Sequence, residues 1–199
     1  MGPTTVWEEK VEQQLRDAIR LREELLRSHV AAIVEIGRRM AACLERGGKV
    51  LLCGNGGSAA DCQHIATELV GRLRAERPGL AAIALTTDTS ALTAIGNDYG
   101  FEHVFARQVE ALARGGDLLL AISTSGDSPN VLAAVAMARA HGVETIGLTG
   151  ARGGRLRGAA DFCLCVPSDD TQRVQEAHIT VGHLACEIAE QAISPGRRA

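Results

Sequence analysis

Five short apolar runs, each ending near Gly, Ser or Thr and leading into a helical stretch, constrain the fold of this chain more than any other feature. Near-continuous apolar strands separated by helices are what a parallel sheet covered on both faces requires. We therefore predict an α/β fold, a doubly wound sandwich around a central, mostly parallel five-stranded sheet. The runs are 49–53, 80–85, 117–122, 143–148 and 162–166.

Two helices are predicted ahead of the first strand. Residues 6–28 are rich in Glu, Arg and Gln and carry apolar residues near helical spacing, and a second helical stretch, 30–45, stops before Gly47 and Gly48. We expect these helices, 6–46, to form an N-terminal hairpin that contributes to packing and oligomerisation. The length of the chain favours a single domain, 1–199.

Composition and charge narrow the class of protein. The chain is 46% hydrophobic and 23% charged, which is typical of a globular protein. Its formal net charge of −3 gives no reason to expect nucleic acid or an anionic membrane as a partner. We see no signal pattern and no apolar stretch of membrane-spanning length, so we expect a cytoplasmic protein. Six cysteines without a C-x-x-C pair are expected to be free thiols.

A glycine loop, 54–58, follows the first predicted strand. Glycines between a strand and a helix let backbone N–H groups approach an anion at the positive end of the helix. The same residues also match a dinucleotide-binding motif, but that motif needs an acidic residue about 20 residues further on. The nearest match, Asp88, lies 34 residues after Gly54, which disfavours dinucleotide binding.

A serine loop, 123–128, follows the third predicted strand and precedes a helix from 129 to 140. Ser128 suits the N-cap and Pro129 the first helical position, so a capped helix alone explains those two residues. Four hydroxyls in six residues also suit the oxygens of a phosphate monoester. Because ligands sit beyond the carboxyl ends of parallel strands, we predict a phosphate site here. Asp127 puts a negative charge in this loop, and we expect its side chain to point outward.

These two loops, in this order and on this fold, resemble the sugar isomerase (SIS) domain family, whose members bind phosphosugars. Further motifs make the chain similar to the sedoheptulose 7-phosphate isomerases, or phosphoheptose isomerases, within that family. The resemblance covers nearly the whole chain. It is carried by 63–68, 86–90, 94–99, 166–168, 172–178 and His183.

The resemblance implies an aldose-ketose isomerase that converts sedoheptulose 7-phosphate to D-glycero-D-manno-heptose 7-phosphate through an enediol(ate), the first step of bacterial heptose biosynthesis. It also implies one zinc ion per subunit and a homotetramer. Glu68 and His183 are the implied catalytic acid/base pair. The implied metal ligands are His64, Glu68, Gln175 and His183. The implied contacts with the phosphorylated seven-carbon sugar are Asn55, Gly56, Gly57, Ser58, Glu68, Asn97, Asp98, Ser123, Thr124, Ser125, Ser128 and Gln175.

The residue types suit this chemistry. His64 and Glu68 are four residues apart on a predicted helix and can share a cation, although such a pair is more often a solvated surface pair. An aldose-ketose exchange needs a base, an acid and stabilisation of the enediolate, which a carboxylate, an imidazole and a metal can supply. Since zinc weakens a carboxylate as a base, either the metal is mainly structural or Glu68 leaves it during turnover.

Gln175 and His183 raise a geometric question. On one regular helix they are about 12 Å apart along the axis and about 80° apart around it, which is awkward for sharing one ion. Either Gln175 lies at or before an irregular helix start, or the two ligands reach a given zinc from different subunits. We therefore predict active sites at subunit interfaces.

One alternative function uses the same fold without catalysis. It is a SIS-domain scaffold that binds a replication initiator protein. Relatives of that kind share the loops but lack the full acid/base and metal set, whereas Glu68 and His183 are both present in this chain.

Overall fold

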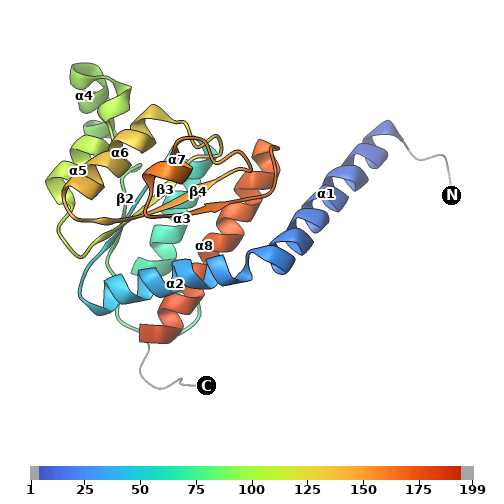
Figure 1. Cartoon of the computed structure of the whole chain (residues 1–199), viewed down its shortest axis with the longest axis horizontal. Helices are drawn as coiled ribbons and strands as arrows, with labels where there is room; N and C mark the ends of the chain where they lie inside the picture. Colours follow the sequence, from blue (N-terminus) through green and yellow to red (C-terminus); the bar gives the residue numbers. More distant parts are fainter. Residues whose placement is uncertain (1–4, 194–199) are drawn as a thin grey trace.

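The computed structural model describes residues 5–193, and its centre is one parallel sheet with the strand order β2-β1-β3-β4-β5 (Figure 1). This order and the helices on both faces confirm the predicted doubly wound α/β fold. Each strand overlaps its predicted run. β2 is shorter than its run because only three of its residues pair with β1. The strands are β1 (Val50–Gly54), β2 (Ala82–Ala84), β3 (Leu118–Ile122), β4 (Glu144–Thr149) and β5 (Phe162–Cys165).

The two faces of the sheet are covered by different helices, because alternate side chains of a strand point to opposite faces. Leu52 faces a core formed with α2 (Val30–Glu45), α3 (Gly57–Val70) and α8 (Thr171–Ile193). Leu51 and Leu119 face the other core. The elements on that side are α4 (Thr89–Tyr99), η1 (Phe101–His103), α5 (Ala106–Leu112), α6 (Pro129–Ala140) and α7 (Leu156–Ala159).

Strands β1 and β3 are direct neighbours, and this brings the two predicted loops together. Gly54, at the end of β1, pairs in register with Ile122, at the end of β3. The glycine loop therefore leads into α3 beside the point where the serine loop leads into α6. Both helices begin at the carboxyl edge of the sheet, where their N-terminal N–H groups can face a shared ligand.

The two N-terminal helices have the predicted bounds, but they do not form a hairpin. α1 (Val6–Ser28) and α2 are separated by one residue, His29, and α1 projects away from the body while α2 lies across α8 (Figure 1). The prediction of a hairpin is wrong because an antiparallel turn needs about two to five linking residues. His29 is anchored by its Nε2, which donates to the carbonyl of Cys165 at 3.2 Å.

The cysteines are all free thiols, as predicted. Cys53 and Cys62, which flank the glycine loop, are both fully buried. Burial raises the pKa of the Cys53 thiol to about 12, so this residue packs the core and is not a nucleophile. None of the helices in the described part of the chain is long and apolar enough to cross a membrane.

Candidate active site

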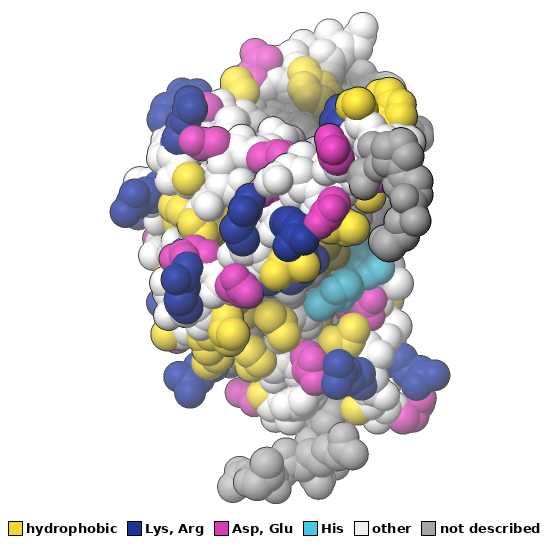
Figure 2. Space-filling model, turned by 90° about the vertical axis from the view of Figure 1, so that its right-hand side faces the viewer, with side chains coloured by type: hydrophobic (Ala, Val, Ile, Leu, Met, Phe, Trp, Pro, Cys, Tyr) yellow, Lys and Arg dark blue, Asp and Glu magenta, His cyan; other side chains and the backbone are white. Residues whose placement is uncertain are grey.

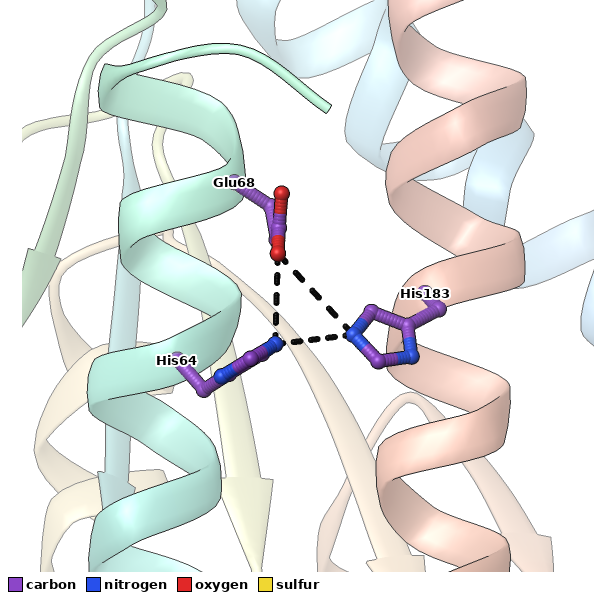
Figure 3. A group of neighbouring side chains, drawn as sticks. All are labelled: His64, Glu68 and His183. Atoms are coloured by element: carbon purple, nitrogen blue, oxygen red, sulfur yellow. Dashed lines mark hydrogen bonds and ion pairs between the residues drawn. The ribbon is translucent and has the colours of Figure 1, made fainter. Parts of the chain in front are cut away.

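A carboxylate and two imidazoles converge between α3 and α8 (Figure 3). His64 Nε2 lies 2.8 Å from His183 Nε2 and 3.2 Å from Glu68 Oε1. Glu68 Oε1 lies 4.0 Å from His183 Nε2. We call these three residues the His-Glu-His cluster. The four-residue spacing of His64 and Glu68 puts both on one face of α3, as predicted. In the structure this face meets α8.

The cluster is partly open to solvent. The side chains of His64 and His183 are 52% and 42% exposed, and that of Glu68 is 19% exposed. Histidine side chains reach the surface on the face shown in Figure 2, among acidic, basic and apolar groups. The cluster is therefore accessible to a ligand while its carboxylate is largely shielded from water.

The donor set fits a zinc ion. Zinc takes nitrogen and oxygen ligands at about 2.0 to 2.2 Å, which places tetrahedral ligand atoms about 3.3 Å from one another. The three separations in the His-Glu-His cluster, 2.8, 3.2 and 4.0 Å, bracket that value. Three protein ligands leave a fourth position open, which is typical of catalytic zinc sites.

Gln175, the fourth predicted ligand, is not in this cluster. It lies in the second turn of the continuous helix α8, so the proposal that it precedes an irregular helix start is wrong. Its amide group instead packs on the glycine loop. A Cβ added at Gly57 would lie 2.6 Å from Gln175 Nε2, so only glycine fits at that position without moving the side chain.

A hollow of about 490 Å³ borders Gln175. Asp61 also lines it, and the Oδ2 atom of Asp61 is buried and has no hydrogen-bond partner among the described residues. Burial raises the pKa of Asp61 to about 6. Asp61 was not among the predicted site residues, although its position one helical turn before His64 is a signal that could have identified it.

The serine loop is folded around its own hydroxyl groups. Ser123 Oγ lies 3.0 Å from Ser128 Oγ and 3.4 Å from Ser125 Oγ, and it accepts the N–H of Gly126 at 3.2 Å. Ser128 occupies the N-cap position of α6, as predicted, but its side chain makes no capping hydrogen bond. Its hydroxyl instead faces the loop, where it is bonded to Ser123, and capping alone does not explain this orientation.

Asp127 points out of the serine loop, as expected. Its carboxylate accepts the backbone N–H and the Nε of Arg155, each at 3.1 Å, and these bonds hold the pKa of Asp127 below its usual value. A cavity of about 310 Å³ opens beside the loop. Arg152 lines this cavity, and its Nε lies 3.3 Å from Oδ1 of Asp169 on the same wall. The residues lining the cavity are Thr124, Ser125, Asp127, Arg152, Asp169, Thr171 and Val174.

Asn55 connects the glycine loop to the start of α6. Its Nδ2 donates to Asn130 Oδ1 at 2.9 Å, and Asn130 Nδ2 donates back to Asn55 Oδ1 at 2.8 Å. Asn130 is only 2% exposed. The role of Asn130 was not predicted, because the pairing depends on β1 and β3 being neighbours.

Asn97 and Asp98 lie elsewhere. They are in the last turn of α4, on the opposite face of the sheet from α3 and α8, and Asn97 Nδ2 donates to Asp98 Oδ1 at 2.8 Å. Apart from this bond between them, neither forms a hydrogen bond with a predicted site residue in the described part of the chain. Within one chain, Asn97 and Asp98 therefore lie apart from the other predicted site residues.

The fold and the two loops define a sugar isomerase domain, and a model of the SIS domain family matches residues 13–150. The chain is 54% identical to the phosphoheptose isomerase of Roseiflexus sp. over 192 residues, 96% of this chain and 98% of that protein. It is 56% identical to that of Rhodospirillum rubrum over 162 residues, 81% and 86% of the two chains. The chain belongs to the phosphoheptose isomerase family within the SIS domain proteins.

Solved structures agree with this assignment. A phosphoheptose isomerase from Neisseria gonorrhoeae aligns with a TM-score of 0.88 at 47% identity, covering 93% of this chain and 99% of that one. One from Francisella tularensis aligns with a TM-score of 0.91 at 42% identity, covering 94% and 100%. The resemblance to this family inferred from the sequence motifs is confirmed.

Proposed function

We propose that this chain interconverts sedoheptulose 7-phosphate and D-glycero-D-manno-heptose 7-phosphate, an aldose-ketose isomerisation. One observation carries the proposal: the carboxylate of Glu68 and the imidazole of His183 converge from two helices in a member of the phosphoheptose isomerase family. A base and an acid that face a common point are what proton transfer between adjacent carbons requires.

The phosphate binds at the serine loop. The hydroxyls of Ser123, Ser125 and Ser128 and the N-terminus of α6 supply hydrogen-bond donors and a favourable dipole for it. Thr124 and Arg152 line the adjacent cavity. Anchoring the phosphate there positions the other end of the sugar for reaction.

Glu68 and His183 move the protons. In the direction from ketose to aldose, one of them takes a proton from C1, next to the carbonyl carbon C2. The resulting enediolate receives a proton at C2, and transfer of a hydroxyl proton from O1 to O2 completes the exchange. Both side chains keep contact with solvent, so their protons can be exchanged between turnovers.

We propose zinc as the cofactor, one ion per subunit, held by His64, Glu68 and His183. Gln175 lies apart from these three residues within one chain, so in this proposal it reaches the ion from a neighbouring subunit. When bound, zinc supplies positive charge that stabilises negative charge developing on the sugar oxygens. The nitrogen and oxygen donors and their separations support this choice.

The active sites belong to subunit interfaces of a homotetramer. Three features support this: Gln175 and Asp61 face an open hollow, Asn97 and Asp98 lie far from the cluster, and α1 carries an uncovered apolar stripe. Val11, Leu15 and Ile19 in that stripe are 57–60% exposed. Apolar residues that recur every four positions on a projecting helix are suited to packing against another helix.

Subunit association is tested by adding charge to the stripe. Leu15→Glu with Ile19→Glu should convert the tetramer to smaller species in light scattering coupled to size-exclusion chromatography. Gln13→Lys, which adds a charge on the polar face of α1 and keeps a donor for Asp17, should not. If the doubly substituted protein is still a tetramer, α1 does not form the subunit interface.

The activity is tested by incubating the zinc-loaded protein with sedoheptulose 7-phosphate and following the aldose by NMR. Glu68→Gln keeps the size of the side chain but removes its basicity, so turnover should fall by about 10² to 10⁴. Glu110→Gln, the same exchange on the surface helix α5, should turn over normally. A wild-type protein that forms no aldose contradicts the proposal.

The proposed compartment is the cytoplasm, with no nucleic-acid or membrane partner. The alternative function, a scaffold that binds a replication initiator protein, gains no support from the relatives reported above, which are named as phosphoheptose isomerases.

A further inference from the structure

A buried carboxylate on α8 holds the segment that follows α3. Glu190 is 1% exposed, yet its two oxygens accept four hydrogen bonds. The backbone N–H groups of Leu73, Arg74 and Ala75 donate to it at 3.0, 2.9 and 3.0 Å. Arg77 Nε donates at 3.1 Å. Burial by itself raises the pKa of Glu190, but the three backbone donors and the charge of Arg77 lower it overall, so the group is a carboxylate.

Arg77 in turn holds the C-terminal end of α3. Its side chain is 2% exposed, and its terminal nitrogens donate to the carbonyl oxygens of Glu68 at 2.9 Å and Leu69 at 2.8 Å. The last carbonyl groups of a helix have no partner within the helix. Arg77 satisfies two of them, and one belongs to a residue of the His-Glu-His cluster.

The Arg77-Glu190 pair therefore connects the two helices that carry the cluster. Glu190 is seven residues after His183, about two helical turns, and so lies on nearly the same face of α8. The helices already approach closely, since a Cβ added at Gly182 would lie 2.6 Å from Ile65 Cδ1. The contact at Gly182 sets the distance between α3 and α8. The Arg77-Glu190 pair then sets how far α3 is shifted along its axis and rotated about it, and so where Glu68 lies relative to α8.

We propose that Arg77 and Glu190 are positioning residues that hold the Glu68 carboxylate in register with His183. A buried ion pair with a purely structural role would stabilise the fold without altering the cluster in a folded protein. A positioning pair also affects the reaction and the affinity for a metal. The inference rests on the proposed function only for its kinetic effect, because metal binding reports on the cluster independently.

The surface offers a matched control. Arg74 Nη1 lies 3.0 Å from Glu187 Oε1, joining the same two segments one turn earlier on α8. The Arg74 side chain is 72% exposed, and this pair makes no hydrogen bond to a carbonyl of α3. Substitutions there change the same residue types in the same segments without touching the end of α3.

The test compares Arg77→Lys and Glu190→Gln with the controls Arg74→Lys and Glu187→Gln. Lysine keeps the positive charge but lacks the branched guanidinium group that donates to two carbonyl groups at once. Cooperative thermal unfolding identifies the folded variants. Isothermal titration calorimetry of the metal-free proteins with Co²⁺ measures the metal affinity of the His-Glu-His cluster. The reaction is followed by kcat and KM for sedoheptulose 7-phosphate.

We expect the folded Arg77 or Glu190 variant to bind Co²⁺ about 10- to 100-fold more weakly, as for other residues that orient metal ligands. We expect kcat to fall by a similar factor with KM within about twofold, because the serine loop is untouched. The control variants should match the wild type. If Arg77→Lys does not fold, Glu190→Gln, which keeps an acceptor oxygen, decides the question.

Wild-type affinity for Co²⁺ in a folded Arg77 or Glu190 variant overturns the inference and leaves the proposed isomerase intact. If the wild type itself does not isomerise the sugar, the proposed function fails, and the Co²⁺ affinities still decide whether this pair positions the cluster.

Discussion

The Nε2 atoms of His64 and His183 face each other at 2.8 Å, although the residues are 119 positions apart and lie on different helices. A hydrogen bond between these atoms needs one Nε2 to donate a proton and the other to accept it. With a cation between them, both nitrogens present lone pairs to it. A metal ion bound by both rings would therefore replace the hydrogen bond between them.

Removing one of these rings should weaken metal binding. His64→Gln leaves two strong ligands in the His-Glu-His cluster, so we expect the affinity for Zn²⁺ to fall by at least about 100-fold. This loss is larger than that usually caused by changing a residue that only orients a metal ligand. Titration against a chromophoric chelator measures this. His103→Gln, an exposed histidine on η1, should keep wild-type affinity. Equal affinities for both variants would place the metal elsewhere.

The hydroxyl of Ser128 should matter for the ligand and little for the fold. Ser128→Ala removes no capping bond, and its one lost hydrogen bond is the one to the hydroxyl of Ser123, so the free energy of unfolding should fall by only about 0.5 kcal/mol. The KM for the phosphosugar should rise about 10-fold or more, through loss of a hydrogen bond to a charged group.

A true N-cap provides the comparison for Ser128. Asp88 Oδ1 accepts the N–H of Ala91 at 2.9 Å at the start of α4. Asp88→Ala should lower the free energy of unfolding by about 1 kcal/mol, measured by urea titration. If Ser128→Ala destabilises as much as Asp88→Ala while KM is unchanged, the serine loop is only a helix start.

The Asn55-Asn130 pair should couple the two loops. Asn130→Ala leaves the amide of Asn55 without its partner and should lower the free energy of unfolding by about 1 to 3 kcal/mol. The double variant Asn55→Ala with Asn130→Ala should lose less stability than the sum of the two single variants. Each single change leaves one amide group without its partner, and the double change removes both groups. Additive losses would contradict the coupling.

The stability of the fold should decrease in mild acid because of His178. This side chain is fully buried in α8, and burial lowers its pKa from 6.5 to about 4, although a bond to the carbonyl of Thr149 opposes the shift. The unfolded chain therefore binds the proton more readily between pH 6.5 and 4, and stability falls as pH falls through that range.

Between pH 7 and 5 the loss attributable to His178 is about 2 kcal/mol. Urea unfolding at the two pH values measures it, and His178→Gln, which keeps a donor for Thr149, should flatten the dependence. An unchanged slope in that variant would assign the acid sensitivity to other groups.

Local patterns predicted the fold well, because its strands and helices follow from local apolar periodicity. The bounds of α1, α2 and α6 agree with prediction because amphipathic spacing, glycine stops and an N-terminal proline mark them in the chain. The missing hairpin is a different case. One residue, His29, decides whether the chain reverses or continues, and its backbone conformation is not visible in a helical periodicity.

The candidate site could be predicted only in part. His64 and Glu68 share a helix face, so their proximity follows from spacing, and His183 was selected through the family resemblance. The contact of Gln175 with Gly57 and the bonds of Arg77 to α3 join residues that are far apart in the chain. Such contacts depend on how the helices pack on the sheet, which local patterns do not contain.

The bond from His29 to Cys165 joins the start of α2 to the last strand of the sheet. The direction in which α1 leaves the body thus depends in part on β5, a strand made late in synthesis, beside the packing of Leu21 and Leu25 in the core. If subunits associate through α1, a chain whose β5 has not docked presents that helix at another angle and is a poor partner. Assembly would then act as a check that each subunit has finished folding.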